Sequence, residues 1–319
     1  MKKISISKTS KKGYITFSIF AVVIVYIIFA APGFLHFDNL MNVLISAAFV
    51  AIPAMGLSTV MLTGSFDLSF VGIIGLTSVI MIRMIEAAIP IPLVLLCGLG
   101  IAISIELINA FLIVKLKIHP WLTTIATMLA TLGLEKAISK AYFLTISDGF
   151  FGGIRFNSFI GIPLSVWILI IVFVIVYSFV HKTIIGLHFY AIGGNEITAK
   201  KAGIKVDLMR FLSFGVMGFC IWVVSLVYLA QLSGYTPEAA YTNLNEVILS
   251  VFFGMSISKR NIVTITGTLI GAIFVALLAN GLALAGVSSY WIKLVEGFLV
   301  VIVVITNSLG SGELVQLEK

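Results

Sequence analysis

The chain has 319 residues, of which 60% are hydrophobic and only 10% are charged, against about 25% charged residues in an ordinary soluble domain. This composition excludes a soluble globule, a disordered protein and a free nucleic-acid binder. A membrane crossing takes about 20 apolar residues, so about ten crossings would use most of the chain. The net charge of +7 is therefore informative mainly through where the basic residues lie between the crossings.

Ten apolar segments follow one another along the sequence, and each predicts a helix that spans a membrane. The first, 14–31, follows five lysines and is too long for the core of an ordinary signal peptide, so we interpret it as a retained span. The other nine cover about 41–63, 68–89, 91–114, 120–138, 163–180, 211–232, 242–257, 262–286 and 290–307. The prediction is an all-α polytopic membrane protein whose residues 1–319 form a single transmembrane domain in the lipid bilayer.

The positions of Lys and Arg predict the orientation of these spans. If the lysine-rich start is cytoplasmic, fifteen of the 20 basic residues lie on the cytoplasmic side, which agrees with the positive-inside rule. Both termini are then expected in the cytoplasm. An outer hydrophilic stretch at about 139–162 is rich in glycine and is predicted to be irregular or partly re-entrant. An inner stretch at about 181–210 is the longest polar one.

The sequence lacks the motifs of common enzyme sites. It contains no G-x-x-x-x-G-K-[ST] phosphate loop, so ATP-driven work would need another subunit. The histidines show no H-E-x-x-H spacing, and no serine lies in a G-x-S-x-G elbow. We therefore expect no catalytic residue, no metal site and no cofactor in this chain.

The inner stretch contains the signals of a short capped helix. Asn195 can accept hydrogen bonds from the first free amides, and Glu196 suits the positive end of the helix dipole. Lys200 and Lys201 suit the negative end, and Gly203 can adopt the left-handed stop conformation. The pattern predicts a helix of about seven residues, which would be an inert loop helix or a docking element for a partner.

Several runs together resemble a known family. The run AIGGNEITAKKAGIKV at 191–206 is similar to the cytoplasmic coupling segment of ABC importer permeases of the ribose and branched-chain amino acid superfamily. In the same order the chain has LTGSFDLS at 62–69, LINAFLIVKLKIHPWLTTIATM at 107–128, GTLIGA at 267–272 and NGLALAGVSSYW at 280–291. The sugar branch, which includes ribose permeases, fits best.

The resemblance implies a function and partners. It implies a permease subunit of the bacterial cell membrane that imports a small polar solute, a monosaccharide such as ribose or a related compound. Two permease copies, or this chain with a related permease, would lie side by side. ABC ATPase subunits would dock on their cytoplasmic loops, and an extracytoplasmic solute-binding protein would deliver the solute. No nucleic acid is implied.

The resemblance also assigns roles to residues. The residues implied in ATPase coupling are Gly193, Gly194, Asn195, Glu196, Ala199, Lys200 and Gly203, with Ala199 expected to pack in a groove of the ATPase. The residues implied in a structural turn are Gly64, Asp67 and Ser69. Candidates for the solute pathway, for which hydrogen bonding between helices is an equal alternative, are Asn109, Thr124, Asn280 and Ser289.

The chain also departs from the family pattern. Ser65 and Val71 stand where the family usually has glycines, the loop at 254–263 is poor in glycine, and Glu296 replaces a usual lysine. We expect Glu296 to pair with Lys293, one helical turn away. These departures leave other solutes open, namely a nucleoside, an autoinducer or a branched-chain amino acid. An ion-coupled secondary transporter is a further alternative, for which Glu106 is the obvious ion-binding candidate.

Overall fold

The computed structural model describes residues 22, 25–146, 148–258 and 262–311. The first predicted span therefore lies largely outside the described residues, and so does part of the glycine-poor loop at 254–263. The chain divides into two compact units, one formed by residues 55–244 and the other by 1–54 together with 245–319.

Each of the nine predicted apolar segments from 41–63 onward contains a helix, and most helix ends lie within a few residues of the predicted bounds. The helices are α2 (Phe37–Leu62), α3 (Phe70–Glu86), α4 (Ile91–Val114), α5 (Pro120–Ser139), α6 (Gly149–Phe156), α7 (Leu164–Lys182), α8 (Ile184–Gly194), α9 (Glu196–Lys201), α10 (Val206–Leu232), α11 (Leu244–Ile257), α12 (Ile265–Leu284) and α13 (Ser289–Ser311). The short elements are β1 (Leu144–Thr145), β2 (Ser158–Phe159), β3 (Ile162–Pro163), β4 (Gly234–Tyr235) and the 3-10 helix η1 (Ala240–Asn243).

Five of the described helices, α2, α4, α7, α10 and α12, are long and apolar enough to cross a membrane. This confirms an all-α polytopic membrane protein. Helices α3 and α11 have only 17 and 14 residues, which is short for a crossing of the hydrocarbon core. The predicted total of ten crossings and the cytoplasmic placement of both termini stay predictions.

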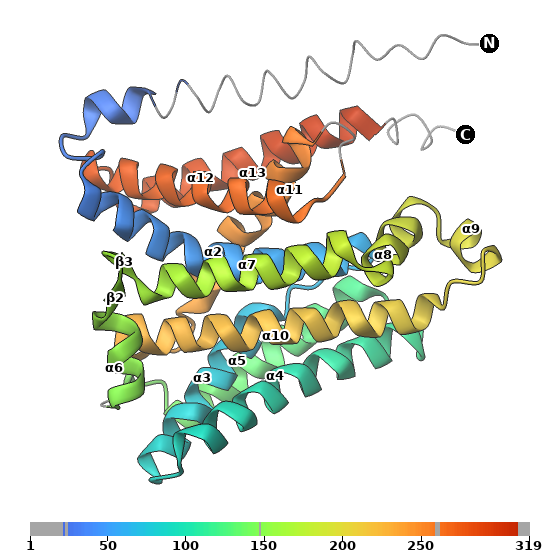
Figure 1. The fold of residues 1–319 in the computed structure, drawn as a ribbon, viewed down its shortest axis with the longest axis horizontal. Coiled ribbons are helices and arrows are strands. Elements are labelled where there is room, and N and C mark those ends of the chain that lie inside the picture. Colours follow the sequence, from blue (N-terminus) through green and yellow to red (C-terminus); the bar gives the residue numbers. More distant parts are fainter. Residues whose placement is uncertain (1–21, 23–24, 147, 259–261, 312–319) are drawn as a thin grey trace. The chain divides into compact units, whose positions relative to one another are not determined.

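In the unit formed by residues 55–244, α10 packs along α4 and α3, and α5 packs on the other side of α3 (Figure 1). Helix α10 begins at Val206, five residues before the predicted start, and takes in Asp207 and Arg210. Asp207 lies in its first turn, where an acidic side chain stabilises the positive end of the helix dipole. This earlier start places Arg210 on the helix itself.

In the other unit, buried side chains from both ends of the chain form one core. Ile27, Ala31 and Phe34 pack with residues of α11, α12 and α13. Phe253 stacks on Phe274, with ring centroids 5.0 Å apart. Segments far apart in sequence therefore join in this unit through apolar packing.

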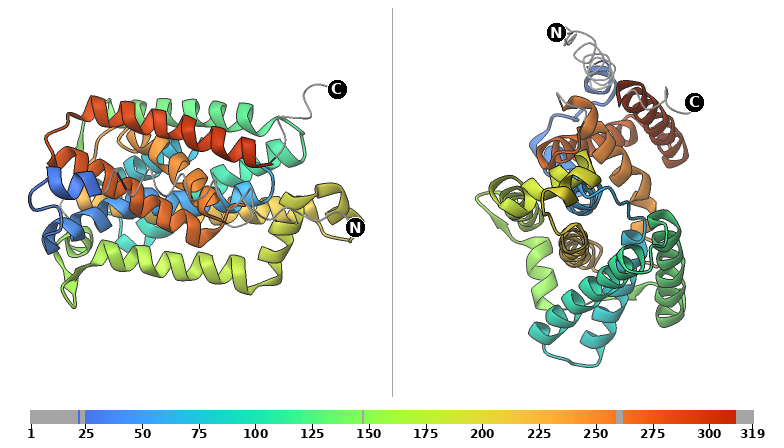
Figure 2. Two further views of the ribbon diagram at one scale, coloured as in Figure 1. Left: turned by 90° about the horizontal axis from the view of Figure 1, so that it is seen from above. Right: turned by 90° about the vertical axis from the view of Figure 1, so that its right-hand side faces the viewer.

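The inner stretch at 181–210 contains two helices where one was predicted. The chain turns at Thr183, and α8 leaves the axis of α7 there (Figure 2). The Thr183 hydroxyl donates to the carbonyl of Phe179 at 2.6 Å and accepts from the amide of Gly186 at 3.3 Å. One side chain thus ends α7 and starts α8. The sequence analysis missed α8 because its 11 residues are too few to cross a membrane and lie within the stretch that was interpreted as a polar loop.

The outer stretch at 139–162 is largely ordered. It contains α6, and its strand β1 pairs with β4, with Leu144 opposite Tyr235 and Thr145 opposite Gly234. Strands β2 and β3 form a second short antiparallel pair. The pairing of β1 with β4 attaches the outer stretch to the segment that follows α10.

Candidate functional site

The short helix α9 has the caps that the sequence predicts. The Asn195 side chain accepts a hydrogen bond from the backbone N–H of Thr198 at 2.8 Å. Gly203 ends the helix with a φ of +84°. This conformation is unfavourable for any residue that has a Cβ atom. These two local contacts define a helix of six residues, close to the predicted length.

A cation from α10 attaches α9 to the rest of the unit. Arg210 donates from Nη2 to Oε2 of Glu196 at 2.6 Å and from Nε to the carbonyl of Thr63 at 3.3 Å. The other carboxylate oxygen of Glu196 accepts from Lys200 at 2.6 Å. Arg210 therefore joins α9 to the segment that follows α2. The sequence analysis missed this role because the partners of Arg210 are 14 and 147 residues away.

The charges around Glu196 hold its pKa below the ordinary value of 4.5, first through the hydrogen bond from Lys200 and then through Arg210. The Arg210 side chain is only 16% exposed, whereas that of Lys200 is 53% exposed. Water and salt screen the more exposed pair more strongly. The pair between Glu196 and Arg210 is therefore the more persistent link.

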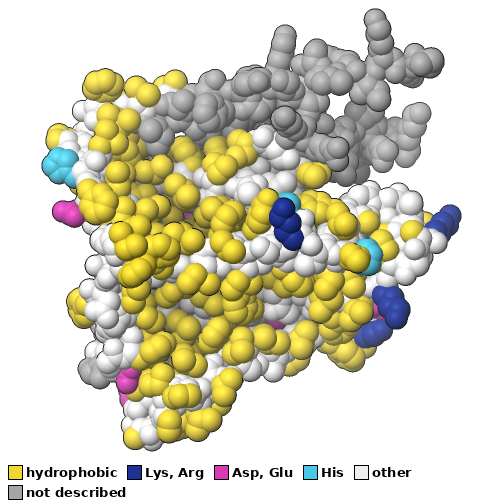
Figure 3. Space-filling model, in the orientation of Figure 1, with side chains coloured by type: hydrophobic (Ala, Val, Ile, Leu, Met, Phe, Trp, Pro, Cys, Tyr) yellow, Lys and Arg dark blue, Asp and Glu magenta, His cyan; other side chains and the backbone are white. Residues whose placement is uncertain are grey.

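The two faces of α9 have different surroundings. Ala199 is 3% exposed and packs within the chain itself, so it does not present its side chain to a partner, contrary to the expectation that it packs in an ATPase groove. Ile197 is 68% exposed on the same short helix. Lys and Arg side chains gather at this end of the unit in Figure 3. Ile197 was missed because the direction of a side chain on so short a helix depends on tertiary packing.

Gly193 lets α8 approach the end of α2 closely. A Cβ atom at this position would lie 2.5 Å from the carbonyl oxygen of Leu62, a distance at which backbone must shift. No such contact is found for Gly194. Gly193 thus brings the inner helices against the residues that precede the 63–69 turn.

The 63–69 turn contains the second group of predicted residues. Gly64 has φ of +74°. The Asp67 carboxylate accepts hydrogen bonds at Oδ1 from the backbone N–H of Ser69 at 2.8 Å and from its hydroxyl at 2.6 Å. Asn109 on α4 donates to the Ser69 hydroxyl at 2.9 Å and accepts from Thr127 on α5 at 2.6 Å. The turn is thereby joined to two neighbouring helices.

The four candidate pathway residues have different environments. Asn109 is buried within the network just described, and Thr124 is buried with its hydroxyl donating to the carbonyl of Pro120. Asn280 exchanges two side-chain hydrogen bonds with Asn39, at 3.0 and 3.1 Å. Ser289 is exposed at the start of α13. Asn109 and Thr124 belong to the unit formed by residues 55–244, whereas Asn280 and Ser289 belong to the other unit.

Lys293 pairs with Glu296 as expected, at 3.0 Å, and also with Glu246 on α11 at 2.5 Å. Glu296 is fully buried, so a nearby cation offsets part of its desolvation. The partner Glu246 was missed because it lies 47 residues away in sequence. The three charges join α11 to α13.

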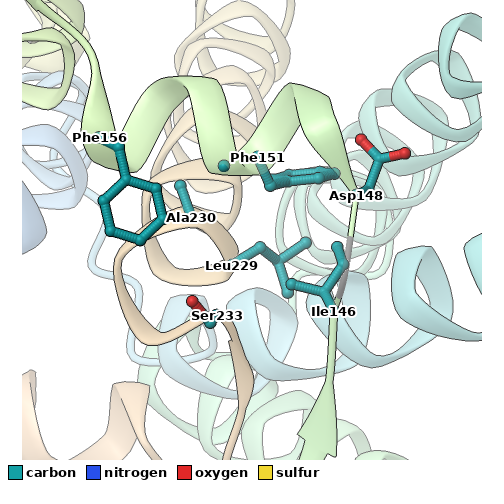
Figure 4. A pocket seen from close by; sticks show the side chains of 8 residues that line it. Ile146, Asp148, Phe151, Phe156, Leu229, Ala230 and Ser233 are labelled. Carbon is teal, nitrogen blue, oxygen red and sulfur yellow. The ribbon is translucent and has the colours of Figure 1, made fainter.

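A pocket of about 320 Å³ lies between α6 and the end of α10. It is lined by Ile146, Asp148, Phe151, Gly152, Phe156, Leu229, Ala230 and Ser233. Figure 4 shows two phenylalanine rings and the Asp148 carboxylate on one side, with the three α10-end residues on the other. The sequence analysis did not predict this pocket, because its lining comes from two segments, 146–156 and 229–233, that are distant in sequence.

Helices that are long and apolar enough to cross a membrane, together with a short capped helix held by its own chain, are typical of a membrane transport subunit. Residues 39–304 match the family described as branched-chain amino acid transport system / permease component. The chain belongs to this family, and it is a transport permease, not an enzyme. It is a multi-pass protein of the bacterial cell membrane.

Curated relatives match the chain over nearly its whole length. The ribose import permease protein RbsC of Bacillus subtilis is 31% identical over 91% of both chains. The protein of the same name from Haemophilus influenzae is 30% identical over 89% of both chains. The galactofuranose transporter permease protein YtfT of Escherichia coli is 26% identical over 85% of this chain and 80% of its own.

Acid should loosen α9. Because the pKa of Glu196 is lowered in the folded state, its ion pairs stabilise the fold fully at pH values above 4.5. That stabilisation is lost as the pH falls from there through the lowered pKa. We expect the α9 amides to exchange hydrogen severalfold faster in Glu196→Gln than in the wild type at pH 7, and the difference to vanish in acid.

The control is Glu238→Gln, which removes a surface pair with Lys136 in a different part of the unit. It should leave the exchange of α9 unchanged at both pH values. Equal α9 protection in the wild type and Glu196→Gln at pH 7 would show that the Arg210 link does not hold the helix.

Proposed function

We propose that this chain is the membrane-spanning permease subunit of an ATP-driven ABC importer for a small polar solute, a monosaccharide such as ribose or a related compound. The observation that carries the proposal is its similarity, over nearly its whole length, to proteins named ribose import permeases. Its partners would be ABC ATPase subunits, an extracytoplasmic solute-binding protein and a second permease, identical or related.

A different sugar is the second candidate solute. A relative named for galactofuranose also matches most of the chain, so membership of the family is compatible with more than one sugar. Ser65, Val71 and Glu296 depart from the family pattern. Because of these departures, we propose ribose or a related compound as the solute, and not ribose alone. A nucleoside, an autoinducer or a branched-chain amino acid is the less supported choice.

Docking of the ATPase would use the exposed face of α9. Ile197 is a large apolar side chain exposed to water at a charged end of the unit, and such a side chain is suited to a pocket in a partner. Lys200 and Lys201 flank it and are exposed. Ala199, buried beneath, would hold the helix in place for docking.

Movement of α9 would pass into the membrane through Arg210. Its guanidinium contacts Glu196 on α9 and the Thr63 carbonyl beside the 63–69 turn, and it is itself part of α10. The 27 residues of α10 correspond to a length of about 40 Å. A displacement of α9 by the ATPase would thus act on α10, α2 and the turn together, which is what alternating access requires.

We also propose the topology. Ten spans, both termini in the cytoplasm and one permease domain over 1–319 would place the coupling segment at about 181–210 inside and the pocket beside α6 outside. The amides of Asn109 and Asn280 are engaged with other side chains, so we propose a helix-packing role for them. Thr124 and Ser289 stay the proposed solute-pathway residues.

The function can be tested in proteoliposomes that contain this chain, its ABC ATPase partner and the solute-binding protein loaded with ribose. Uptake should need ATP and should not follow a proton or sodium gradient. Galactofuranose in place of ribose separates the two sugar candidates. Uptake that follows an ion gradient without ATP would contradict the importer and favour a secondary transporter.

Ile197→Glu should weaken binding of the ATPase at least about tenfold, because a charge buried without a partner costs more than about 1.4 kcal/mol. The permease itself should still fold and insert, since Ile197 makes little contact with its own chain. Co-purification of the ATPase and solute-stimulated ATP hydrolysis provide the measurements.

The matched control is Ile160→Glu, which introduces the same charge at a residue that is 77% exposed between β2 and β3. It should leave ATPase binding unchanged. If Ile197→Glu binds the ATPase normally, α9 is not part of the docking surface.

Labelling of single cysteines tests the topology. In a background that carries Cys97→Ser and Cys220→Ser, Ser158→Cys should react with an impermeant thiol reagent from outside intact cells. Thr198→Cys should react only after the membrane is opened, because the basic residues near it favour the cytoplasm. Both residues are exposed, so reaction of both from the same side would overturn the proposed arrangement.

A further inference from the structure

Two buried carboxyl groups face each other beside the 63–69 turn. Asp67 follows α2, and Glu106 lies in the middle of α4; both are fully buried. Their side chains are close enough to share a hydrogen bond. No role in transport or coupling proposed above uses this pair, and the following inference does not rest on the proposed function.

The hydrogen bonds around the pair are unequal. Oδ1 of Asp67 accepts two hydrogen bonds from Ser69, whereas Oδ2 of Asp67 and both carboxyl oxygens of Glu106 have no hydrogen-bond donor. Asn109, about one turn along α4, donates to the Ser69 hydroxyl at 2.9 Å, and its side-chain amide also lies near Glu106. Two carboxylates can only accept, so in the ionised state neither can satisfy the other.

No described cation compensates the pair. Within residues 25–146 and 148–258, neither carboxyl forms an ion pair with Lys, Arg or His. The charged side chains and the histidine on the helices that pack against α4 have other partners or are exposed; they are Arg83 with Glu86 on α3, His119 before α5, Glu135 and Lys136 on α5, and Asp207 and Arg210 on α10. The thiol of Cys220 and the phenol of Tyr228, also on α10, are buried and carry no positive charge. Two buried, adjacent negative charges without a counter-ion are strongly unfavourable.

We propose that Glu106 is protonated and donates its O–H to Oδ2 of Asp67, so that the pair holds one occluded proton. The proton comes from solvent and no other bond changes. Glu106 is the proton carrier because the two hydrogen bonds from Ser69 stabilise the carboxylate of Asp67, whereas the amide of Asn109 near Glu106 already donates to the Ser69 hydroxyl. One proton removes one of the two charges and supplies the missing donor. It also fastens the 63–69 turn to α4.

Infrared spectroscopy of the full chain in lipid nanodiscs at neutral pH tests the proposal. The wild type should show the C=O stretching band of a protonated carboxylic acid, and Glu106→Gln should lose part of that band. The matched control is Glu86→Gln, which removes an exposed acid that is paired with Arg83. It should leave the band unchanged. Equal bands in the wild type and Glu106→Gln would overturn the proposal.

Thermal unfolding gives a second, independent readout. Glu106→Gln keeps a neutral donor of the same shape, so it should fold with a midpoint near that of the wild type, whereas Glu106→Leu should unfold several degrees lower. The wild type should lose stability as the pH rises because the unfolded chain releases the proton, and Glu106→Gln should lose less. Failure of Glu106→Gln to fold would contradict a neutral Glu106. If Na⁺ stabilises the wild type but not Glu106→Gln, the pair binds a metal cation and not a proton, which would overturn the proposal.

Discussion

Polar side chains inside a bilayer must find partners within the protein, because hydrocarbon offers neither donors nor acceptors. The described polar contacts follow from this constraint. Asn39 with Asn280, Asn109 with Ser69 and Thr127, and Lys293 with Glu246 each join different segments of the chain. The apolar surface alone cannot set which helices meet, since lipid is equally apolar. Paired polar groups and close packing therefore specify the arrangement within each unit.

The same constraint acts in the larger unit at the place where Arg210 of α10 contacts α9. The backbone of Arg210 belongs to α10, and its guanidinium contacts Glu196, whose side chain is partly exposed. The Arg210 side chain itself is only 16% exposed. Its two partners belong to different segments, so breaking either contact would leave a partly buried cation with fewer acceptors. A joint of this kind tolerates small displacements of α9 only if α10 and the end of α2 move with it.

Sequence reasoning succeeded where the signal is local. Long apolar runs located nine helices, and Asn195 and Gly203 located the ends of α9, because capping depends on residues within one turn. It failed where the outcome depends on contacts distant in sequence. Ala199 was expected to face outward but is buried, and the partners of Arg210 and Lys293 could not be read from the chain. The pocket beside α6 is lined by residues of 146–156 and 229–233, two segments that are distant in sequence. The family motifs indicated the family, but not how their residues contact one another.

The burial of Ala199 under an exposed Ile197 has a consequence for how such a subunit could change over evolutionary time. The pedestal of α9, formed by Asn195, Glu196, Ala199 and Arg210, is internal to the chain. The surface that remains for recognition is only a few side chains wide. If α9 docks the ATPase as proposed above, a small number of substitutions around Ile197 could adapt the subunit to a different ATPase without disturbing the membrane helices. Substitutions in the pedestal would instead disturb the contacts that hold α9 on α10 and on the segment after α2.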